Sequence, residues 1–124
     1  ALALEDLLEV HFTNTDLTYS FDKHGMENRL PAKVEVALFR IAQELFTNII
    51  KHSGAKNIDI QLMKMKNHCL LIVHDDGVGI SDNNASDGIG MQNMSNRLRT
   101  INGDLSIDSE VGDGTTATIK IALN

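Results

Sequence analysis

Apolar residues recur along this chain at two spacings, one typical of helices and the other of strands. The segment after Pro31 predicts a long helix over about 32 to 53, because proline favours the first helical turn and a Ser-Gly pair ends the pattern. A shorter helix is predicted over 91 to 101, and residues 2 to 12 have the spacing of a helix end. The apolar face of the long helix consists of Leu38, Ile41, Ala42, Leu45 and Ile49.

Alternation of apolar and polar residues predicts the strands. The second and third strands form an antiparallel pair, joined by a polar turn at 66–68. The predicted strands lie near 17–21, 58–62, 70–73, 105–107 and 117–121. Because helices that flank such strands pack on the sheet, the pattern predicts an α+β or α/β two-layer sandwich.

The composition indicates the type of domain and its cellular environment. The chain has 124 residues, of which 42% are hydrophobic and 23% charged, as in a soluble globular domain with one modest core. No apolar run approaches the roughly 20 residues of a membrane helix. We therefore expect a cytoplasmic domain without membrane contact, with any membrane anchor of the parent protein outside this segment. The single Cys69, set among apolar residues, predicts a buried thiol in a reducing compartment.

Two glycine-rich turns carry the strongest chemical signal in the chain. The first, Asp75 to Gly79, directly follows the third predicted strand, and the second, Gly88 to Gly90, precedes the shorter helix. Glycines let the backbone approach a ligand closely, and free N–H groups at a helix start favour an anion. Together the turns predict a nucleotide pocket, with the aspartate at the base and the helix start at the phosphates. Taken alone, the first turn is also compatible with a plain hairpin.

A polar stripe on the long helix adds a second group of candidate residues. Glu44, Asn48, Lys51 and His52 share one face of the helix, beside the apolar face and thus at the rim of a cleft. Carboxylate and amide oxygens suit a hard cation such as Mg²⁺. The net charge of −6 argues against a nucleic-acid surface and repels anions, so the two basic residues would supply the local positive charge that an anionic ligand needs. A solvated helix face is the alternative reading of this stripe.

Four motifs follow one another along the chain: Glu44-x-x-x-Asn48-x-x-Lys51-His52, Asp75-x-Gly77-x-Gly79, Gly88-x-Gly90-Met91 and Gly112-x-Gly114-Thr115. In order and spacing they resemble those of the Bergerat-fold ATPases, which include sensor histidine kinases, type II topoisomerases and Hsp90 chaperones. Further segments are Leu30-Pro31, Arg40-Ile41-Ala42-Gln43-Glu44, Lys51-His52-Ser53-Gly54-Ala55 and Gly90-Met91-x-x-Met94-x-x-Arg97-Leu98. With these segments, roughly residues 30 to 124 look most like the catalytic ATP-binding domain of histidine kinases of the NarL/DesK type.

The resemblance implies a particular fold and domain arrangement. The expected fold is an α+β two-layer sandwich, with a mixed, mostly antiparallel sheet of about five strands covered on one face by about three helices. Residues 1–14 would be the end of a dimerisation or connector helix, and residues 15–124 the ATP-binding catalytic domain.

The resemblance also implies how the adenine base is held. Asp75 corresponds to the aspartate that accepts a hydrogen bond from the adenine amino group, a contact that distinguishes adenine from guanine. Gly77 and Gly79 let the backbone lie against the base, where a side chain would block it. Thr115 corresponds to a motif threonine on a strand beneath the base, beside the aspartate.

The phosphate half of the site follows from the same resemblance. Asn48 corresponds to the Mg²⁺ ligand, and Lys51 and His52 to positions that contact the phosphates. Glu44 corresponds to the glutamate that activates water in topoisomerases and Hsp90, whereas in kinases it would mainly support the Mg²⁺ shell. The sequence leaves both roles for this glutamate open.

The segment between the two glycine turns is expected to be a lid. Residues 81 to 89 are polar, and in the family such a segment is ordered by ATP. Gly88 and Gly90 would frame the end of this lid over the phosphates, and the N–H groups near Met91 would face them.

The implied activity is phosphoryl transfer from Mg-ATP to a histidine on a dimerisation domain absent from this chain. The implied partners are that domain and a response regulator, and the full-length protein would be a homodimer. An ATPase or an anti-sigma-type serine kinase on the same fold is the first alternative. A degenerate module that binds a partner without nucleotide is the second.

Overall fold

The described residues form a five-stranded sheet, in the order β1-β2-β3-β5-β4. The computed structural model describes residues 6, 8–9, 12, 17–25, 30–50, 56–77, 95–110 and 114–123. Its elements are β1 (Thr18–His24), α2 (Ala32–Asn48), β2 (Asn57–Lys64), β3 (His68–Asp75), β4 (Gly103–Glu110) and β5 (Gly114–Ala122), and residues 95–99 are also helical. Within these residues, no helix is long and apolar enough to cross a membrane.

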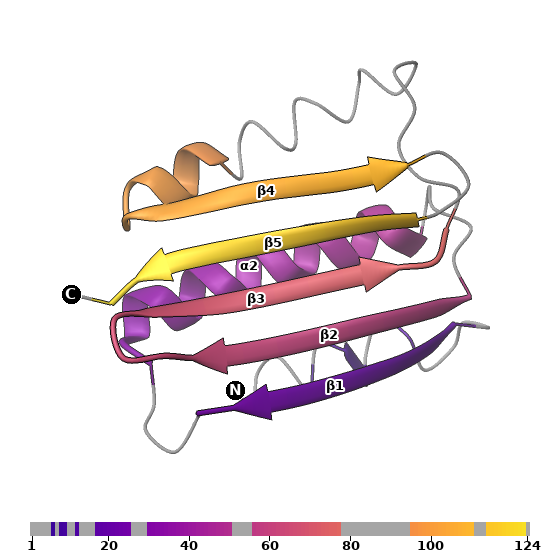
Figure 1. Cartoon of the computed structure of the whole chain (residues 1–124), viewed down its shortest axis with the longest axis horizontal. Coiled ribbons are helices and arrows are strands. Elements are labelled where there is room, and N and C mark those ends of the chain that lie inside the picture. Colours follow the sequence, from indigo (N-terminus) through magenta and orange to yellow (C-terminus); the bar gives the residue numbers. More distant parts are fainter. Residues whose placement is uncertain are drawn as a thin grey trace.

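The pairing of the strands confirms the expected mixed sheet. β1 runs parallel to β2, and the other neighbouring pairs are antiparallel. α2 connects the parallel pair, as a parallel crossover requires, and lies against one face of the sheet (Figure 1). The predicted α+β class and two-layer arrangement are therefore confirmed.

α2 begins at the predicted residue, and its regular α-helical part ends at Asn48, before the predicted end near residue 53. The Pro31 carbonyl accepts the backbone N–H groups of Val34 and Glu35, at 2.9 and 3.0 Å, which starts the first turn. After Asn48 the next two residues continue in a wider π turn. The remaining predicted helical residues, 51–53, lie outside the described ranges.

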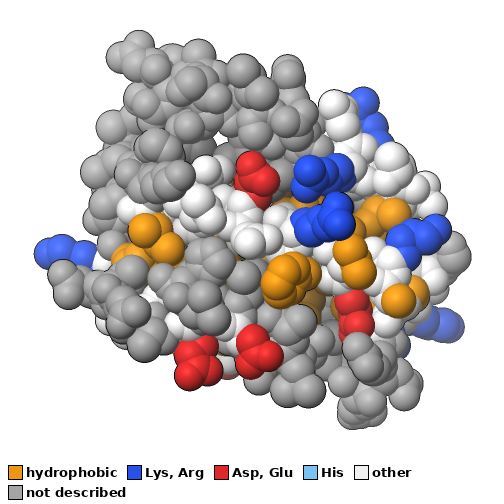
Figure 2. Space-filling model, turned by 180° about the vertical axis from the view of Figure 1, so that it is seen from behind, with side chains coloured by type: hydrophobic (Ala, Val, Ile, Leu, Met, Phe, Trp, Pro, Cys, Tyr) orange, Lys and Arg blue, Asp and Glu red, His pale blue; other side chains and the backbone are white. Residues whose placement is uncertain are grey.

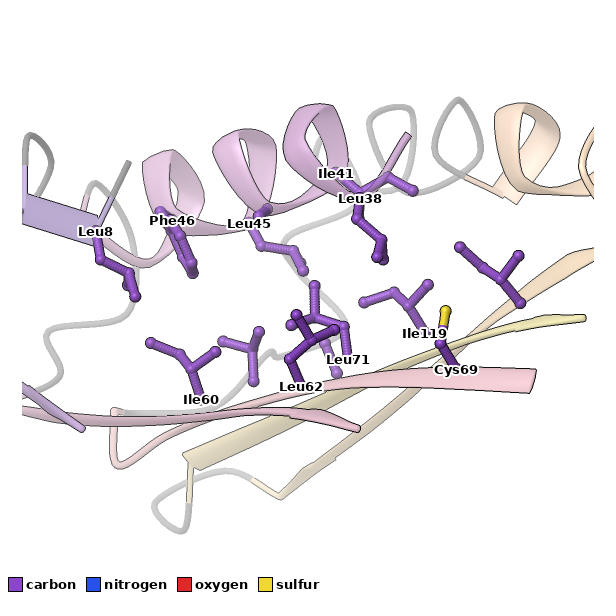
Figure 3. Close-up of a cluster of buried hydrophobic side chains, with 14 of the residues drawn as sticks. Leu8, Leu38, Ile41, Leu45, Phe46, Ile60, Leu62, Cys69, Leu71 and Ile119 are labelled. Carbon is purple, nitrogen blue, oxygen red and sulfur yellow. The ribbon is translucent and has the colours of Figure 1, made fainter. Parts of the chain in front are cut away.

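The core lies between α2 and the sheet. All five residues of the predicted apolar face are buried, and β3 alternates strictly, with every second side chain turned inward. Figure 3 shows the side chains of Leu38 and Leu45 pointing from α2 toward the sheet, where Leu71 and Ile119 lie. The full cluster is Leu8, Phe12, Leu30, Val34, Leu38, Ile41, Ala42, Leu45, Phe46, Ile49, Ile58, Ile60, Leu62, Cys69, Leu71, Val73, Leu98, Ala117, Ile119 and Ile121.

Two core members bear on particular predictions. Cys69 is fully buried, and burial raises the pKa of its thiol to about 11, so the predicted buried thiol is confirmed. Leu8 and Phe12 belong to the same cluster as α2, and the ring of Phe12 meets that of Phe46 edge-on at a centroid distance of 5.3 Å. The predicted boundary between residues 14 and 15 remains a prediction.

Candidate functional site

The ends of several strands and of α2 meet at one end of the sheet. β3 ends there, β2 and β5 begin there, and α2 reaches the same end (Figure 1). In the ladders, Asp75 pairs with Ile58 on one side and with Thr115 on the other. Asp75, the last residue of β3 and the first of the glycine turn, is thus held between two strands and lies beside the start of β5.

Asp75 is the one charged side chain that is buried among the described residues, with 4% of its surface exposed. Its Oδ1 accepts the backbone N–H of Gly77 at 2.9 Å. Burial raises the pKa of this carboxyl, while the Gly77 hydrogen bond and the nearby His74 oppose the shift. The result is a carboxylate with a fixed orientation at the end of a strand, which can accept a hydrogen bond from a bound molecule.

A glycine at the start of β5 maintains this close arrangement. Gly114 has a φ of 91°, a conformation that residues with a side chain rarely adopt. A Cβ atom there would overlap the carbonyl oxygen of Asp75. Thr115 therefore follows a position that only glycine can occupy, directly beside the aspartate, as the motif resemblance expects.

The polar face of α2 lines an open cavity of about 460 Å³. Glu44 and Asn48, the two described residues of the predicted stripe, both line it. Asn48 is half-buried, whereas Glu44 is exposed. The full lining is Arg40, Gln43, Glu44, Thr47, Asn48 and Arg97. The two oxygen-bearing side chains are one helical turn apart and fit a hard cation that keeps waters and phosphate oxygens as its other ligands.

Two arginines in this cavity were not singled out as site residues from the sequence. Arg40 lies one turn before Glu44 on α2, a spacing that could have indicated it. Arg97 comes from the helical residues 95–99, and no local signal places it beside α2. Figure 2 shows basic side chains gathered near an acidic one on the helical face of the molecule. These guanidinium groups supply positive charge in a chain of net charge −6.

The other expected site residues lie outside the described ranges. They are Lys51 and His52 at the basic end of the α2 stripe, Gly79 of the first glycine turn, the lid over residues 81–89, and Gly88, Gly90 and Met91 at the second glycine turn. Within the described part of the chain, no group of three or more His, Cys, Asp or Glu side chains is arranged to hold a metal ion.

Comparison with known families identifies the class of protein. The family model for histidine kinase-, DNA gyrase B- and HSP90-like ATPases matches residues 33–124. The chain therefore belongs to this family of ATP-binding domains, and the resemblance inferred from the motifs is confirmed.

Individual relatives narrow the comparison to one branch. The chain is 34% identical over 102 residues to the signal transduction histidine-protein kinase/phosphatase DegS of Bacillus subtilis, covering 79% of this chain and 26% of DegS. It is 28% identical over 128 residues to the oxygen sensor histidine kinase NreB of Staphylococcus carnosus, covering 98% of this chain and 37% of NreB. The chain thus spans about a quarter to a little over a third of these curated relatives, from 26% to 37%.

Solved structures support the fold. The blue-light activated histidine kinase of Erythrobacter litoralis superposes with a TM-score of 0.76 at 17% identity, over 98% of this chain and 40% of that one. The histidine kinase AdeS of Acinetobacter baumannii gives a TM-score of 0.75 at 20% identity, over 99% of this chain and 64% of that one.

Proposed function

We propose that this chain is the ATP-binding catalytic domain of a two-component sensor histidine kinase. It would bind Mg-ATP and present the γ-phosphoryl group to a histidine on a dimerisation domain outside the chain. The observation that carries the proposal is the buried Asp75 carboxylate, fixed by the Gly77 N–H at the end of β3 and beside the start of β5. Its place in a family of ATP-binding domains, and the names of its relatives, support the same reading.

The adenine side of the site rests on hydrogen-bond polarity. Adenine carries an amino group where guanine carries a carbonyl oxygen, so an acceptor-only carboxylate favours adenine. Asp75 is such an acceptor, and its orientation is set before the ligand arrives. In this proposal Gly77 and Gly79 let the backbone lie along the base, and Thr115 lies beneath it next to the aspartate.

The phosphate side rests on the cavity along α2. Asn48 is the proposed Mg²⁺ ligand, with Glu44 one turn away as either a Mg²⁺-shell residue or a catalytic base. A bound Mg²⁺ would neutralise phosphate charge and orient the terminal phosphoryl group. Arg40 and Arg97 line the same cavity and are suited to hold phosphate oxygens through paired N–H groups.

The remaining proposed contacts complete the triphosphate site. Lys51 and His52, which follow Asn48 closely in the sequence, are proposed to contact the phosphates. Gly88, Gly90 and the N–H groups near Met91 are proposed to receive the phosphates as well.

The proposed partners follow from the kinase assignment. They are the domain that carries the phosphoacceptor histidine and a response regulator, with the full-length protein a cytoplasmically acting homodimer. The relatives named above are histidine kinases of which this chain covers 26% and 37%, which supports a parent protein with those additional parts.

The type of phosphoprotein formed tests this proposal. The parent protein is incubated with γ-labelled Mg-ATP, and the labelled protein is treated with acid and with alkali. Phosphohistidine is labile in acid and stable in alkali, so we expect label that only acid removes. Label that survives acid would favour a serine kinase, and release of inorganic phosphate without protein labelling would favour an ATPase. The matched control is Asp75→Asn, which we expect to reduce labelling at sub-saturating ATP, because its binding of Mg-ATP is weakened.

A further inference from the structure

Asp76, the residue after Asp75, accepts three hydrogen bonds through its side chain. Its Oδ1 accepts the backbone N–H groups of Lys56 and Asn57 at 2.8 and 2.9 Å, and its Oδ2 accepts the Asn57 side-chain amide at 2.8 Å. The backbone N–H of Asp76 in turn donates to the Asn57 carbonyl at 3.2 Å. Hydrogen bonds from Asn57 and Lys56 lower the pKa of the Asp76 carboxyl to about 2, so it stays ionised at physiological pH.

These bonds join the end of β3, which carries Asp75, to the start of β2. Regular pairing between β2 and β3 ends at the Ile58–Asp75 pair, and the Asp76 carboxylate continues the connection one residue further. On one side it fixes the backbone next to Asp75. On the other side it holds Lys56, which follows the chain segment leading from α2, and Lys56 itself accepts the Thr18 N–H from β1.

We propose that Asp76 and Asn57 form a latch that positions Asp75 for nucleotide binding. Asp76 is a positioning residue in this scheme, because its carboxylate contacts the protein backbone and acts through its neighbour. This inference rests on the proposed function, since it assigns how the adenine-binding carboxylate is held. Both latch side chains are exposed, so the latch can be altered without opening the core.

Exchanging the two side chains tests the latch. Asp76→Asn keeps an oxygen for the backbone N–H groups but removes the charge that strengthens those bonds, and its amide can bond to Asn57 only if the Asn57 amide turns over. Asn57→Asp alone sets two carboxylates together. The double variant D76N/N57D restores one donor and one acceptor, with the polarity reversed.

The experiment measures Mg-ATP affinity by calorimetry and nucleotide-free melting temperature for the wild type, both single variants and the double variant. We expect each single variant to weaken binding by about fivefold or more, and the double variant to recover to within about twofold of the wild type. The matched control is Asp59→Asn, which removes an exposed carboxylate elsewhere in the sheet. Asp59 lies on β2, and its Oδ1 accepts a hydrogen bond from the Ser20 hydroxyl at 2.6 Å. We expect wild-type affinity for this control.

Each result has a separate meaning. Wild-type affinity in Asp76→Asn, or a double variant no better than the singles, would overturn the latch while leaving the proposed function intact. Affinity losses that merely follow losses in melting temperature, in the control as well, would also overturn it. Absence of Mg-ATP binding by the wild type would overturn the proposed function itself.

Discussion

The substitution Asp75→Asn replaces the buried carboxylate by an amide. We expect it to weaken nucleotide binding without lowering the stability of the nucleotide-free protein. In the structure Oδ1 accepts the Gly77 N–H at 2.9 Å, and an amide must place its single oxygen there to keep that bond. Its NH₂ group then points toward the adenine amino group, donor against donor. Losing a hydrogen bond to a charged acceptor costs about 1.5–3 kcal/mol. That loss corresponds to about 10- to 150-fold weaker binding of Mg-ATP.

The same substitution should not destabilise the nucleotide-free protein. Because burial raises the pKa of Asp75, its carboxyl favours folding below the unfolded-state pKa, and this contribution is lost as pH rises through the folded-state pKa. At neutral pH the ionised group therefore opposes folding, and a neutral amide removes that effect. We expect a melting temperature at pH 7 equal to or above that of the wild type. We also expect the advantage of the variant to disappear as pH falls through the folded-state pKa.

Calorimetry with Mg-ATP and Mg-GTP, together with thermal denaturation without nucleotide, measures both effects. The new amide can donate to the guanine carbonyl, so the preference for ATP over GTP is expected to fall. Asp108→Asn, at an exposed aspartate on β4, serves as a matched control. ATP affinity within twofold of the wild type would refute the adenine contact, and a lowered melting temperature would refute the reasoning about burial.

Three further substitutions test other parts of the site. Asn48→Ala is expected to abolish the Mg²⁺ dependence of ATP binding in a magnesium titration, and a retained dependence would exclude this residue as the ligand. Arg97→Ala is expected to weaken ATP binding by about tenfold and leave adenosine binding unchanged, because charge-assisted bonds to phosphate are lost. Arg99→Ala, on the same helical segment but outside the cavity lining, should leave both affinities unchanged. Gly114→Ala is expected to lower both the urea midpoint and ATP affinity, since its Cβ would overlap the Asp75 carbonyl oxygen at a strained φ. Loss of stability with wild-type affinity would contradict the role of this glycine at the site.

Local patterns were sufficient to predict much of the fold. The apolar positions of α2 report its buried face, and the alternation of β3 reports which side chains face the core, because each periodicity is fixed by backbone geometry. β1 was predicted too short, near 17–21, whereas it extends from Thr18 to His24. This edge strand is largely exposed, so its apolar alternation fades while its parallel ladder with β2 continues to Met63.

Some residues of the site could likewise be predicted from local sequence patterns. The glycine turn after β3 and the Glu44–Asn48 spacing are local features, so the sequence alone indicated a carboxylate near a base and oxygen ligands along a helix. Their motif order also indicated the family. Four of the described site residues thus required no knowledge of the fold: Glu44, Asn48, Asp75 and Gly77.

Only the tertiary structure decided which distant segments meet. Periodicity states which face of a strand is buried but not which strand lies beside it, so the order β1-β2-β3-β5-β4 emerged from packing. That order places Gly114 against Asp75. The fold likewise brings Arg97 to the polar face of α2 and joins Asp76 to Asn57. Such contacts depend on how the whole chain closes around one core, and no local pattern records them.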